Sequence, residues 1–222
     1  MKLTTVLFVA AIFFASSQTT VEAYNPSINV PALPYAVYMA NSDIATQAEY
    51  LGELVGDPHM YEFSIGADTK LALTITQLED EAIIPFSLIA VKQNNQNAGV
   101  VEVGRLTAKD VVWSEIANSG LGLNLLASQK FEANITPGIY RVEVSTSENF
   151  GRYMLTIGEE SADPGYFSTL ADVRMIQKFF GASIFALFLS SYVYYPIGIA
   201  LLLWLFVFTW RRRDLLSGKV HA

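Results

Sequence analysis

The chain has no cysteine in its 222 residues and only two histidines, His59 and His221. The missing thiols exclude a disulfide framework, thiolate catalysis and cysteine-based metal binding. Two histidines also leave little material for a histidine metal site or a catalytic base. The fold must therefore be stabilised by a hydrophobic core, and a chain of this length is long enough to bury one.

Basic residues are scarce before residue 179. Residues 24–178 contain 19 Asp or Glu and 9 Lys or Arg, whereas residues 211–222 contain 4 basic residues and 1 acidic residue. An acidic segment is repelled by phosphate backbones, so nucleic acid is excluded as a partner. The basic end is typical of the cytoplasmic side of a membrane protein.

Charge is absent from Phe179–Trp210, which holds no Asp, Glu, Lys, Arg or His. About 20 helical residues cross the hydrocarbon core of a bilayer, so this run predicts one transmembrane helix over residues 183–210. Two crossings would need about 40 residues and a turn, which excludes a hairpin. The lipid bilayer is therefore the first predicted partner.

The end of this apolar run is a predicted topology anchor. Trp210 suits the membrane–water interface, and Arg211, Arg212 and Arg213 follow it directly. Positive charge is retained on the cytoplasmic side of a membrane, so residues 211–222 are predicted to form a cytoplasmic tail.

A proline lies in the middle of the predicted span. Pro196 lacks a backbone donor and clashes with the preceding turn, so we expect a kink there. Ser190, Ser191 or a neighbouring helix would satisfy the carbonyl that it leaves free. Three nearby tyrosines lie too deep in this predicted span for an interface, so their hydroxyls call for protein partners or for a thinner local bilayer: Tyr192, Tyr194 and Tyr195.

Small side chains recur every fourth residue at Ala182, Ala186 and Ser190. Small residues at this spacing let two helices approach closely, which predicts a helix-packing face. Its partner would be a second copy of the chain or another membrane protein subunit. The alternative is chance, because alanine and serine are common in transmembrane helices.

The N-terminal residues 1–23 have the composition of a secretory signal peptide. Lys2 precedes the apolar run Leu3–Ala15, and Val21–Ala23 places small residues where a signal peptidase cleaves. An uncleaved signal anchor is the alternative. Cleavage after Ala23 predicts a single-pass membrane protein whose N-terminal domain is periplasmic or extracellular.

The outer domain is predicted to be all-β. Residues 24–47 contain Pro26, Pro31 and Pro34 and form an extended lead-in and a first strand. Apolar and polar residues then alternate in many short segments separated by turn residues, which predicts an antiparallel β-sandwich over residues 48–160. The clearest segments begin at Tyr61, Leu71, Tyr140 and Tyr153, and weaker ones are Tyr35–Met39, Tyr50–Val55, Phe86–Val91, Val100–Val103, Val111–Glu115 and Lys130–Asn134.

Two of these segments resemble a known family. Thr136–Val144, with a Pro-x-Gly-x-Tyr strand start, and Gly151–Ile157, with Gly-x-Tyr-x-Leu, resemble the closing strands of bacterial pre-peptidase C-terminal (PPC) domains. Tyr50–Leu54 and Gly56–Phe63 resemble the first turn of that family. The resemblance covers about Ala48–Gly158 and implies a jelly-roll-like sandwich. It also implies a non-catalytic module of the kind appended to secreted enzymes.

Some members of that family bind calcium, which needs several converging oxygen ligands. In this chain His59 stands where a second acid follows Asp57, and the expected acidic strand start reads Ile83–Ser87. Asp57 and Asp68 remain as loop acids, which are common in turns. The sequence therefore predicts no bound metal and no cofactor.

No motif indicates catalysis. His59 lies near Asp57 and serines are plentiful, but no Gly-x-Ser-x-Gly motif accompanies them, so the chain is predicted not to be an enzyme. The acidic run Glu79–Glu81 and the Gly120–Gly122 segment are interpreted as solvated turns. Asn134 begins a glycosylation sequon, which has an effect only in a host that glycosylates it.

Residues 161–182 are predicted to form a juxtamembrane amphipathic helix that runs into the span. Its apolar residues fall near helical spacing at Phe167, Leu170, Val173, Ile176 and Phe180, with Gln177 among them.

We therefore expect a non-enzymatic accessory subunit that binds a partner through its outer sandwich and packs through its helix in a membrane complex. One alternative is a surface receptor for carbohydrate or peptide, with Trp113 or Tyr166 exposed on a groove. A second is a hydrolase that depends on His59. A third resembles the cargo receptors of the secretory pathway, although the cysteines and the tail dilysine of those proteins are missing here.

Overall fold

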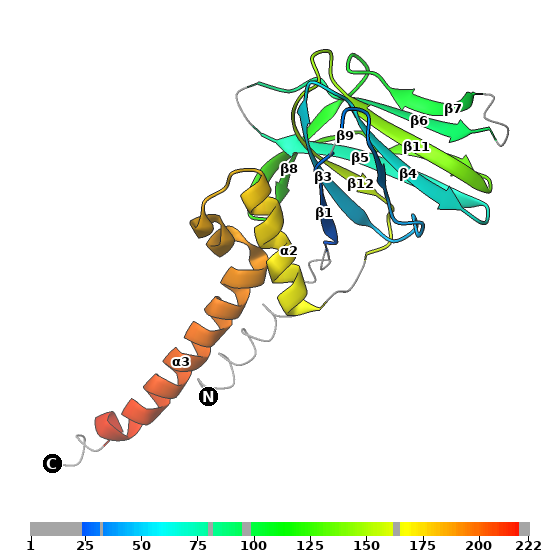
Figure 1. Ribbon diagram of the computed structural model, residues 1–222. Coiled ribbons are helices and arrows are strands. Elements are labelled where there is room, and N and C mark those ends of the chain that lie inside the picture. Colours follow the sequence, from blue (N-terminus) through cyan, green and yellow to red (C-terminus); the bar gives the residue numbers. More distant parts are fainter. Residues whose placement is uncertain (1–23, 32, 80–81, 95–98, 162–164, 218–222) are drawn as a thin grey trace.

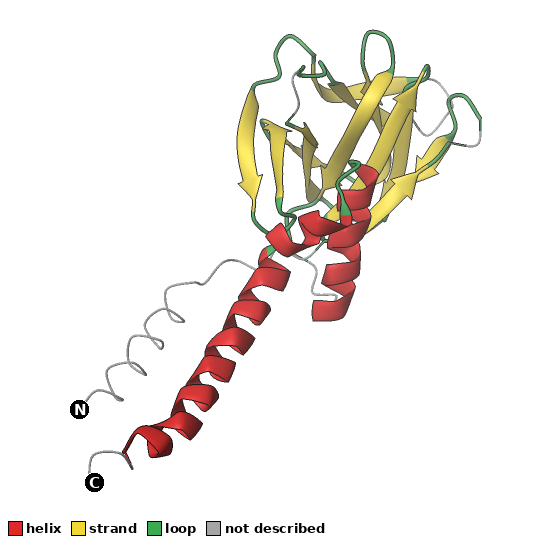
Figure 2. Ribbon diagram, turned by 90° about the vertical axis from the view of Figure 1, so that its left-hand side faces the viewer, coloured by secondary structure: helices red, strands yellow, loops and turns green. Residues whose placement is uncertain are grey.

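Two β-sheets form a sandwich at one end of a long helix, α3 (Ser191–Ser217), which projects away from them (Figures 1 and 2). This computed structural model describes residues 24–31, 33–79, 82–94, 99–161 and 165–217. The predicted signal peptide, residues 1–23, lies outside the described residues, as do residues 218–222 of the predicted tail.

The first sheet has seven strands and the second has five. The first holds, in order, β1 (Pro26–Asn29), β3 (Ala48–Val55), β12 (Phe150–Ile157), β5 (Thr69–Leu78), β9 (Leu123–Ser128) and β8 (Trp113–Asn118), with β10 (Phe131–Ile135) also paired to β5. The second holds β2 (Val37–Met39), β4 (His59–Ile65), β11 (Gly138–Ser145), β6 (Ser87–Gln93) and β7 (Val100–Leu106).

The predicted β-sandwich is confirmed, but its pairing is mixed and not wholly antiparallel. β1 pairs with β3 and β2 pairs with β4 in parallel, whereas the other strand pairs are antiparallel. β1 and β2 both belong to the lead-in. Each lies at the edge of its sheet and runs parallel to its neighbour. β1 was not predicted as a strand, since Pro26 is tolerated only at the start of an edge strand such as this one.

The core between the sheets is built from the predicted alternating positions. Leu71, Leu73 and Ile75 of β5 are buried against Tyr140, Val142 and Val144 of β11. Their polar neighbours point the other way, as the two-residue period of a strand requires. The alternation in the sequence thus identified the faces of the sandwich correctly.

The first sheet is covered on its other face as well, by α2 (Tyr166–Phe179). Val173, Ile176 and Phe180 pack in a second cluster with Leu51, Leu121, Leu125 and Met154 from the sheet side. β9 was missed because burial on both faces removes the alternation that marks a half-buried strand. Phe167 does not join this cluster and is 84% exposed.

The chain reverses after α2 and does not run straight into the span. Gly181 has a φ of 79°, its N–H donates to the Lys178 carbonyl at 3.0 Å, and the Ala182 N–H donates to the Gln177 carbonyl at 2.8 Å. These two bonds and the left-handed glycine form a Schellman motif, which ends the helix. A short 3-10 helix, η1 (Ile184–Leu189), follows before α3 begins.

The α-helix of the predicted span begins at Ser191 and not at residue 183. Ser190 is extended, with φ −72° and ψ 134°, and separates η1 from α3. This break is hidden in the sequence because every residue around it is uncharged.

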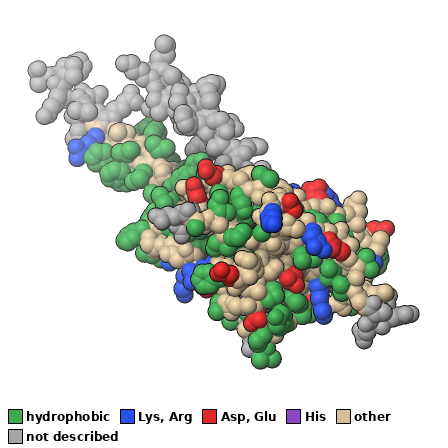
Figure 3. All heavy atoms as spheres, turned by 90° about the horizontal axis from the view of Figure 1, so that it is seen from above, with side chains coloured by type: hydrophobic (Ala, Val, Ile, Leu, Met, Phe, Trp, Pro, Cys, Tyr) green, Lys and Arg blue, Asp and Glu red, His purple; other side chains and the backbone are tan. Residues whose placement is uncertain are grey.

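Within the described residues, one helix is long and apolar enough to cross a membrane. Its stretch Ser191–Arg212 has a mean hydropathy of 1.8, and none of it is buried inside the molecule. At about 1.5 Å per residue, 22 residues extend for about 33 Å, close to the hydrocarbon thickness of a bilayer. Figure 3 shows charges of both signs scattered over the sandwich, whereas hydrophobic side chains cover the projecting helix up to basic residues near its end.

Candidate functional site

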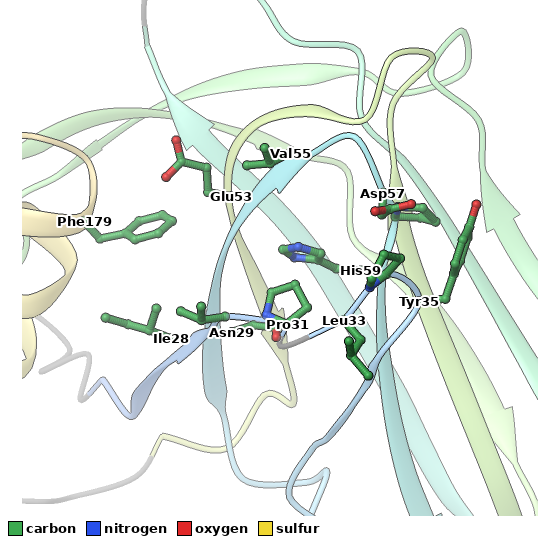
Figure 4. A pocket seen from close by; sticks show the side chains of 13 residues that line it. Ile28, Asn29, Pro31, Leu33, Tyr35, Glu53, Val55, Asp57, His59 and Phe179 are labelled. Carbon is green, nitrogen blue, oxygen red and sulfur yellow. The ribbon is translucent and has the colours of Figure 1, made fainter.

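A groove opens beside the end of α2, between the lead-in strand β1 and the turn that joins β3 to β4 (Figure 4). Its volume is about 480 Å³, which falls within the range of small-molecule and peptide side-chain pockets. We call it the β1 groove. Its principal walls are formed by Ile28, Asn29, Val30, Leu33, Tyr35, Glu53, Val55, Asp57, His59 and Phe179.

The floor of the β1 groove contains a buried hydrogen-bonded chain. His59 is 3% exposed, and its Nδ1 lies 2.8 Å from the Tyr153 hydroxyl, which in turn lies 2.8 Å from the Tyr61 hydroxyl. Burial lowers the pKa of His59, so its imidazole is held in the neutral form. Burial raises the pKa of Tyr61 to about 12, against smaller lowering contributions from Tyr153 and Asn29, and raises that of Tyr153 well above its usual value.

A glycine in β3 makes room for this chain. A Cβ atom on Gly52 would lie 2.5 Å from the Tyr153 hydroxyl and 2.8 Å from His59 Nδ1. Such distances are far shorter than van der Waals contact, so any larger residue would displace the tyrosine or the histidine. Gly52 therefore positions the floor of the groove, although its role cannot be read from the strand pattern.

The buried amide of Asn29 is incompletely bonded. Asn29 is 5% exposed and lines the groove, and its Nδ2 has no hydrogen-bond partner of acceptable geometry among the described residues. Ser27 Oγ, also in β1, is likewise buried and has no hydrogen-bond partner among the described residues. Buried polar atoms are nearly always bonded in folded proteins. The Asn29 side chain also lowers the pKa of Tyr61, so it lies close to the Tyr61 hydroxyl, and that hydroxyl or a ligand oxygen could accept from Nδ2.

An ionic contact supports the wall beside α2. Arg152 Nε lies 3.2 Å from Glu53 Oε1, and Arg152 Nη1 donates to the Phe179 carbonyl at 3.2 Å. The guanidinium also lies 6.0 Å from the centre of the Phe179 ring. Arg152 therefore holds the end of α2 against β3 and keeps the Phe179 wall in place.

The rest of the wall is apolar and open to solvent. Ile28, Val30, Leu33, Tyr35 and Val55 are all exposed large side chains, and Val55 is 75% exposed. A single exposed apolar residue needs no explanation, but several around one concave surface are typical of a binding site.

Among the described residues, the surroundings of His59 do not form the hydrolase site considered from the sequence. His59 is the first residue of β4, and its bonded partner is Tyr153 and not a carboxylate or a serine. The arrangement differs from a Ser-His-Asp site, in which a carboxylate orients the imidazole.

The two loop acids also lie apart. Asp57 precedes β4 and Asp68 follows it, so they stand at opposite ends of a seven-residue strand. A strand of that length spans about 20 Å, and calcium ligands must converge within a few ångströms of the ion. Within the described residues, no group of three or more His, Asp or Glu side chains could hold a metal ion.

The proposed helix-packing residues do not share one α-helical face. Ala182 lies in the turn after α2, Ala186 lies in η1, and Ser190 is fully buried at the end of η1. Ser190 Oγ donates to the Gly120 carbonyl at 2.5 Å. The prediction assumed one continuous α-helix, whereas the chain has a turn and a 3-10 helix here, so the four-residue spacing loses its meaning.

The turn between β8 and β9 receives this segment. Gln177 Nε2 donates to the Leu121 carbonyl at 2.7 Å, and the Ser191 N–H donates to the Ser119 carbonyl at 2.8 Å. Gly122 has a φ of 64°, and a Cβ there would lie 2.8 Å from the backbone of Leu189 and Ser190. We call this contact between the β8–β9 turn, α2 and the start of α3 the junction. The sequence signal was the pair of glycines around Leu121, which was interpreted only as a turn.

Pro196 lies inside α3, and its effect is compensated. A proline removes the bond to the carbonyl four residues earlier, which here belongs to Tyr192. That carbonyl accepts a hydrogen bond from the Tyr166 hydroxyl at 2.7 Å. A neighbouring helix thus supplies the donor, which is one of the solutions that the sequence suggested.

The remaining predicted positions fall at both ends of α3. Trp210 and Arg211 are exposed near its end, and Arg212 lies 4.5 Å from the centre of the Phe208 ring. The side chain of Arg213 is outside the described residues. At the other end, three tyrosines lie in the first turns of α3 and not in its middle, because the helix begins later than predicted: Tyr192, Tyr194 and Tyr195.

The aromatics expected of a surface receptor do not line the β1 groove. Trp113 packs partly against the core cluster, and Tyr166 is bonded to α3. Asn134 is exposed on β10, so its sequon is accessible.

Comparison with protein-family models gives no match, and no curated protein matches the chain by sequence. Among solved structures, one similar chain is the pre-peptidase C-terminal domain of collagenase from Bacillus anthracis, with 16% sequence identity and a TM-score of 0.34. The match covers 57% of this chain and 96% of that one. The β-sandwich described above rests on its own strands, and membership of the PPC family stays a prediction.

Proposed function

We propose that this chain is a non-enzymatic, single-pass membrane protein whose sandwich binds a segment of a partner protein in the β1 groove. The observation that carries the proposal is that apolar walls and buried polar side chains occur together in one cavity. Five exposed apolar side chains surround a cavity that is also lined by the buried side chains of Asn29 and His59, and Asn29 Nδ2 has no hydrogen-bond partner among the described residues. This combination of apolar walls and a few buried polar groups is typical of recognition sites.

The chemistry of the groove defines the partner segment. Its apolar walls favour an apolar or aromatic side chain, and the Asn29 amide favours a carbonyl or hydroxyl oxygen that can accept a hydrogen bond. Glu53 and Asp57 lie at the rim, so a basic residue flanking the apolar one would complement them. An extended peptide with an apolar anchor and a nearby basic residue meets all three conditions.

In this proposal the groove faces the periplasmic or extracellular space and the C-terminus is cytoplasmic. The orientation is supported by the basic residues at the end of α3, since positive charge is retained on the cytoplasmic side. The groove lies beside the end of α2 (Figure 4), and α2 lies next to the start of α3 (Figure 1). A partner that itself resides in the membrane would therefore reach it readily.

Purification of the tagged full-length chain from native membranes in a gentle detergent tests the proposal. We expect a partner subunit to co-purify with the wild type and to be lost from Val55→Asp, which places a charge in the apolar wall. Val101→Asp is the matched control, because Val101 is an equally apolar exposed residue on β7 and does not line the groove. Recovery of the wild type only as a free monomer, or equal losses in the two variants, would contradict the proposal.

A surface receptor for a small ligand is the second candidate. The polar floor of Asn29 and His59 favours it, because a peptide anchor does not require two polar groups at the bottom of the cavity. Thermal melting of the full-length protein with short peptides and with oligosaccharides distinguishes the two. A melting shift given by an oligosaccharide and abolished by Asn29→Leu supports the receptor, whereas a shift given only by peptides supports the partner-binding role.

A further inference from the structure

The short helix η1 carries apolar side chains at every position, and most of them are more than half exposed. Its sequence is Ile-Phe-Ala-Leu-Phe-Leu, and Leu187 alone packs toward the second cluster. Phe185 is 73% exposed, and Ile184, Phe188 and Leu189 are more than half exposed. A soluble surface rarely tolerates four large apolar side chains so close together.

The length of α3 places η1 at a particular depth. If Arg211 marks the inner boundary of the hydrocarbon, then 20 residues at about 1.5 Å each bring the outer boundary, about 30 Å away, to Ser191. Ser191 is the first residue of α3, and η1 ends two residues before it. Figure 2 shows η1 lying across the near end of α3, between that helix and α2.

The backbone around η1 is bonded within the protein. Arg174 Nη1 donates to the Ala182 carbonyl at 3.3 Å and to the Ser183 carbonyl at 3.0 Å. At the other end the Ser190 N–H donates to the Leu187 carbonyl at 3.1 Å, and the Ser191 N–H donates to the β8–β9 turn. Unbonded backbone groups are costly in lipid, so these bonds remove the main obstacle to placing this turn in a membrane.

We infer that η1 lies in the outer interface of the bilayer, with Ile184, Phe185, Phe188 and Leu189 inserted among the lipid acyl chains. Lipid is the occupant that the surroundings favour, because the apolar surface of η1 continues directly into the apolar stretch Ser191–Arg212 of α3, which is not buried inside the protein. No charged residue interrupts Phe179–Trp210. Phenylalanine- and leucine-rich surfaces of short helices are typical of interfacial insertion.

Interfacial aromatic residues surround the same level. Tyr166, Tyr192, Tyr194 and Tyr195 lie at the start of α3 or contact it there. Tyrosine is enriched where the headgroups meet the hydrocarbon, because its ring is apolar and its hydroxyl is polar. We therefore expect these tyrosines and η1 to lie at the same depth, where the lipid headgroups meet the hydrocarbon.

This placement fixes the sandwich at the membrane surface. Because η1 is bonded to the β8–β9 turn through Ser190 and Gly120, insertion of η1 holds the first sheet at a set height above the lipid. The inference depends on α3 crossing the membrane and is independent of what the β1 groove binds.

Spin labelling of the full-length chain in phosphatidylcholine vesicles tests the inference, and the absence of cysteine means that each single-cysteine variant carries one label. Labels at Phe185→Cys and Phe188→Cys are expected to collide with oxygen, which concentrates in lipid, several-fold more than with a water-soluble nickel complex. Leu203→Cys in the middle of α3 is the lipid reference, and Phe150→Cys at the first, exposed position of β12 is the water reference.

Two results would overturn the inference. Labels on η1 that behave like Phe150→Cys would place η1 in water. Labels that are protected from both reagents would show that a second copy or another protein covers η1. Only variants whose melting temperature equals that of the wild type are counted. If a label at Phe185 or Phe188 lowers the melting temperature, Ile184→Cys on the same helix replaces it.

The result separates this inference from the proposed function. Accessibility of η1 to lipid does not depend on a groove partner, so loss of co-purification in Val55→Asp leaves the labelling result unchanged. Conversely, a water-exposed η1 would leave the groove result unchanged.

Discussion

The β1 groove and the junction both lie on the first sheet, but they differ in whether their buried polar groups are hydrogen-bonded within the protein. In the junction, Gln177 is fully buried and its amide donates to the Leu121 carbonyl, while buried Ser190 donates to Gly120. In the groove, Asn29 is buried almost as completely and its Nδ2 has no partner among the described residues. Two buried amides therefore differ in whether the protein itself satisfies them.

The difference indicates two roles. A closed set of hydrogen bonds fixes the geometry of the parts that it joins, because breaking any one leaves a buried group unsatisfied. An unsatisfied donor beside a cavity lowers the stability of the free protein and is retained where a ligand completes it. The junction thus positions the sandwich on α3, whereas the groove keeps a buried donor that the proposed partner would complete.

The largest expected effect comes from Gly122, where the junction has no space. In Gly122→Val the new side chain would overlap the backbone of Leu189 and Ser190 and would hold a β-branched residue at positive φ. We expect the free energy of unfolding to fall by about 3 kcal/mol or more, because η1 would be displaced from the sheet. Hydrogen exchange would show α2 amides exposed while those of β11 stay protected.

Gly66→Val is the control for this change, since nothing lies within 4 Å of a Cβ at Gly66. Protection of α2 that is equal in Gly122→Val and the wild type would show that the junction is not a tight contact.

The second effect comes from the paired amide of the junction. Gln177→Leu removes the donor to the Leu121 carbonyl and leaves that carbonyl buried and unsatisfied. We expect the free energy of unfolding to fall by about 2 kcal/mol, within the usual range for such a loss. Chemical denaturation of the full-length protein in detergent micelles measures it. An unchanged midpoint would mean that the bond contributes nothing.

The corresponding change of a buried amide to leucine in the groove is expected to have the opposite effect on stability. Asn29→Leu removes an amide whose Nδ2 is already unpaired, so stability should stay the same or rise by about 1 kcal/mol. Co-purification of the partner should be lost at the same time. A destabilised Asn29→Leu protein that still binds its partner would reverse the roles assigned to the two regions.

The smallest effect is a pH dependence that arises from His59. Its pKa is lowered in the folded protein, so the unfolded chain binds a proton that the folded chain does not. Stability from this group is complete above its ordinary value of about 6.5 and falls as the pH drops below that. We expect a shallower acid loss of stability in His59→Gln than in the wild type, measured as melting temperature between pH 7 and 5.

Glu49 acts in the opposite sense. Its pKa is raised, mainly by burial, so the stability it contributes is present at low pH and is lost as the pH rises through its folded-state pKa. Taking the difference between the wild type and His59→Gln removes the Glu49 contribution. Identical pH profiles for the two proteins would show that His59 is not kept neutral by burial.

The sequence predicted the parts of the fold that depend on local pattern. Alternation at Tyr61, Phe63 and Ile65 located β4 and its inward face, and the same reasoning located β5, β11 and β12. β4 and β11 are buried on one face, which imposes a two-residue period on their sequences. β5 and β12 show the same period in sequence, although residues on both of their faces are buried.

The parts that it missed depend on contacts between distant residues. The bond from Ser190 to Gly120 joins residues 70 positions apart, and it ends η1 in the middle of an apolar run that looks continuous. β1 and the floor of the groove are likewise defined by their neighbours, since His59 meets Tyr153 only after β4 and β12 have folded. No local periodicity carries such information.

A distance measurement between the sandwich and α3 tests the central claim that the junction holds the two in one orientation. Spin labels at Val101→Cys on β7 and Leu203→Cys on α3 would be placed in the full-length chain, which has no cysteine of its own. The account predicts a single narrow distance distribution for the wild-type junction and a broad one when Gly122→Val is added. A broad distribution in the wild-type background would contradict it, because the sandwich would then move freely on its helix.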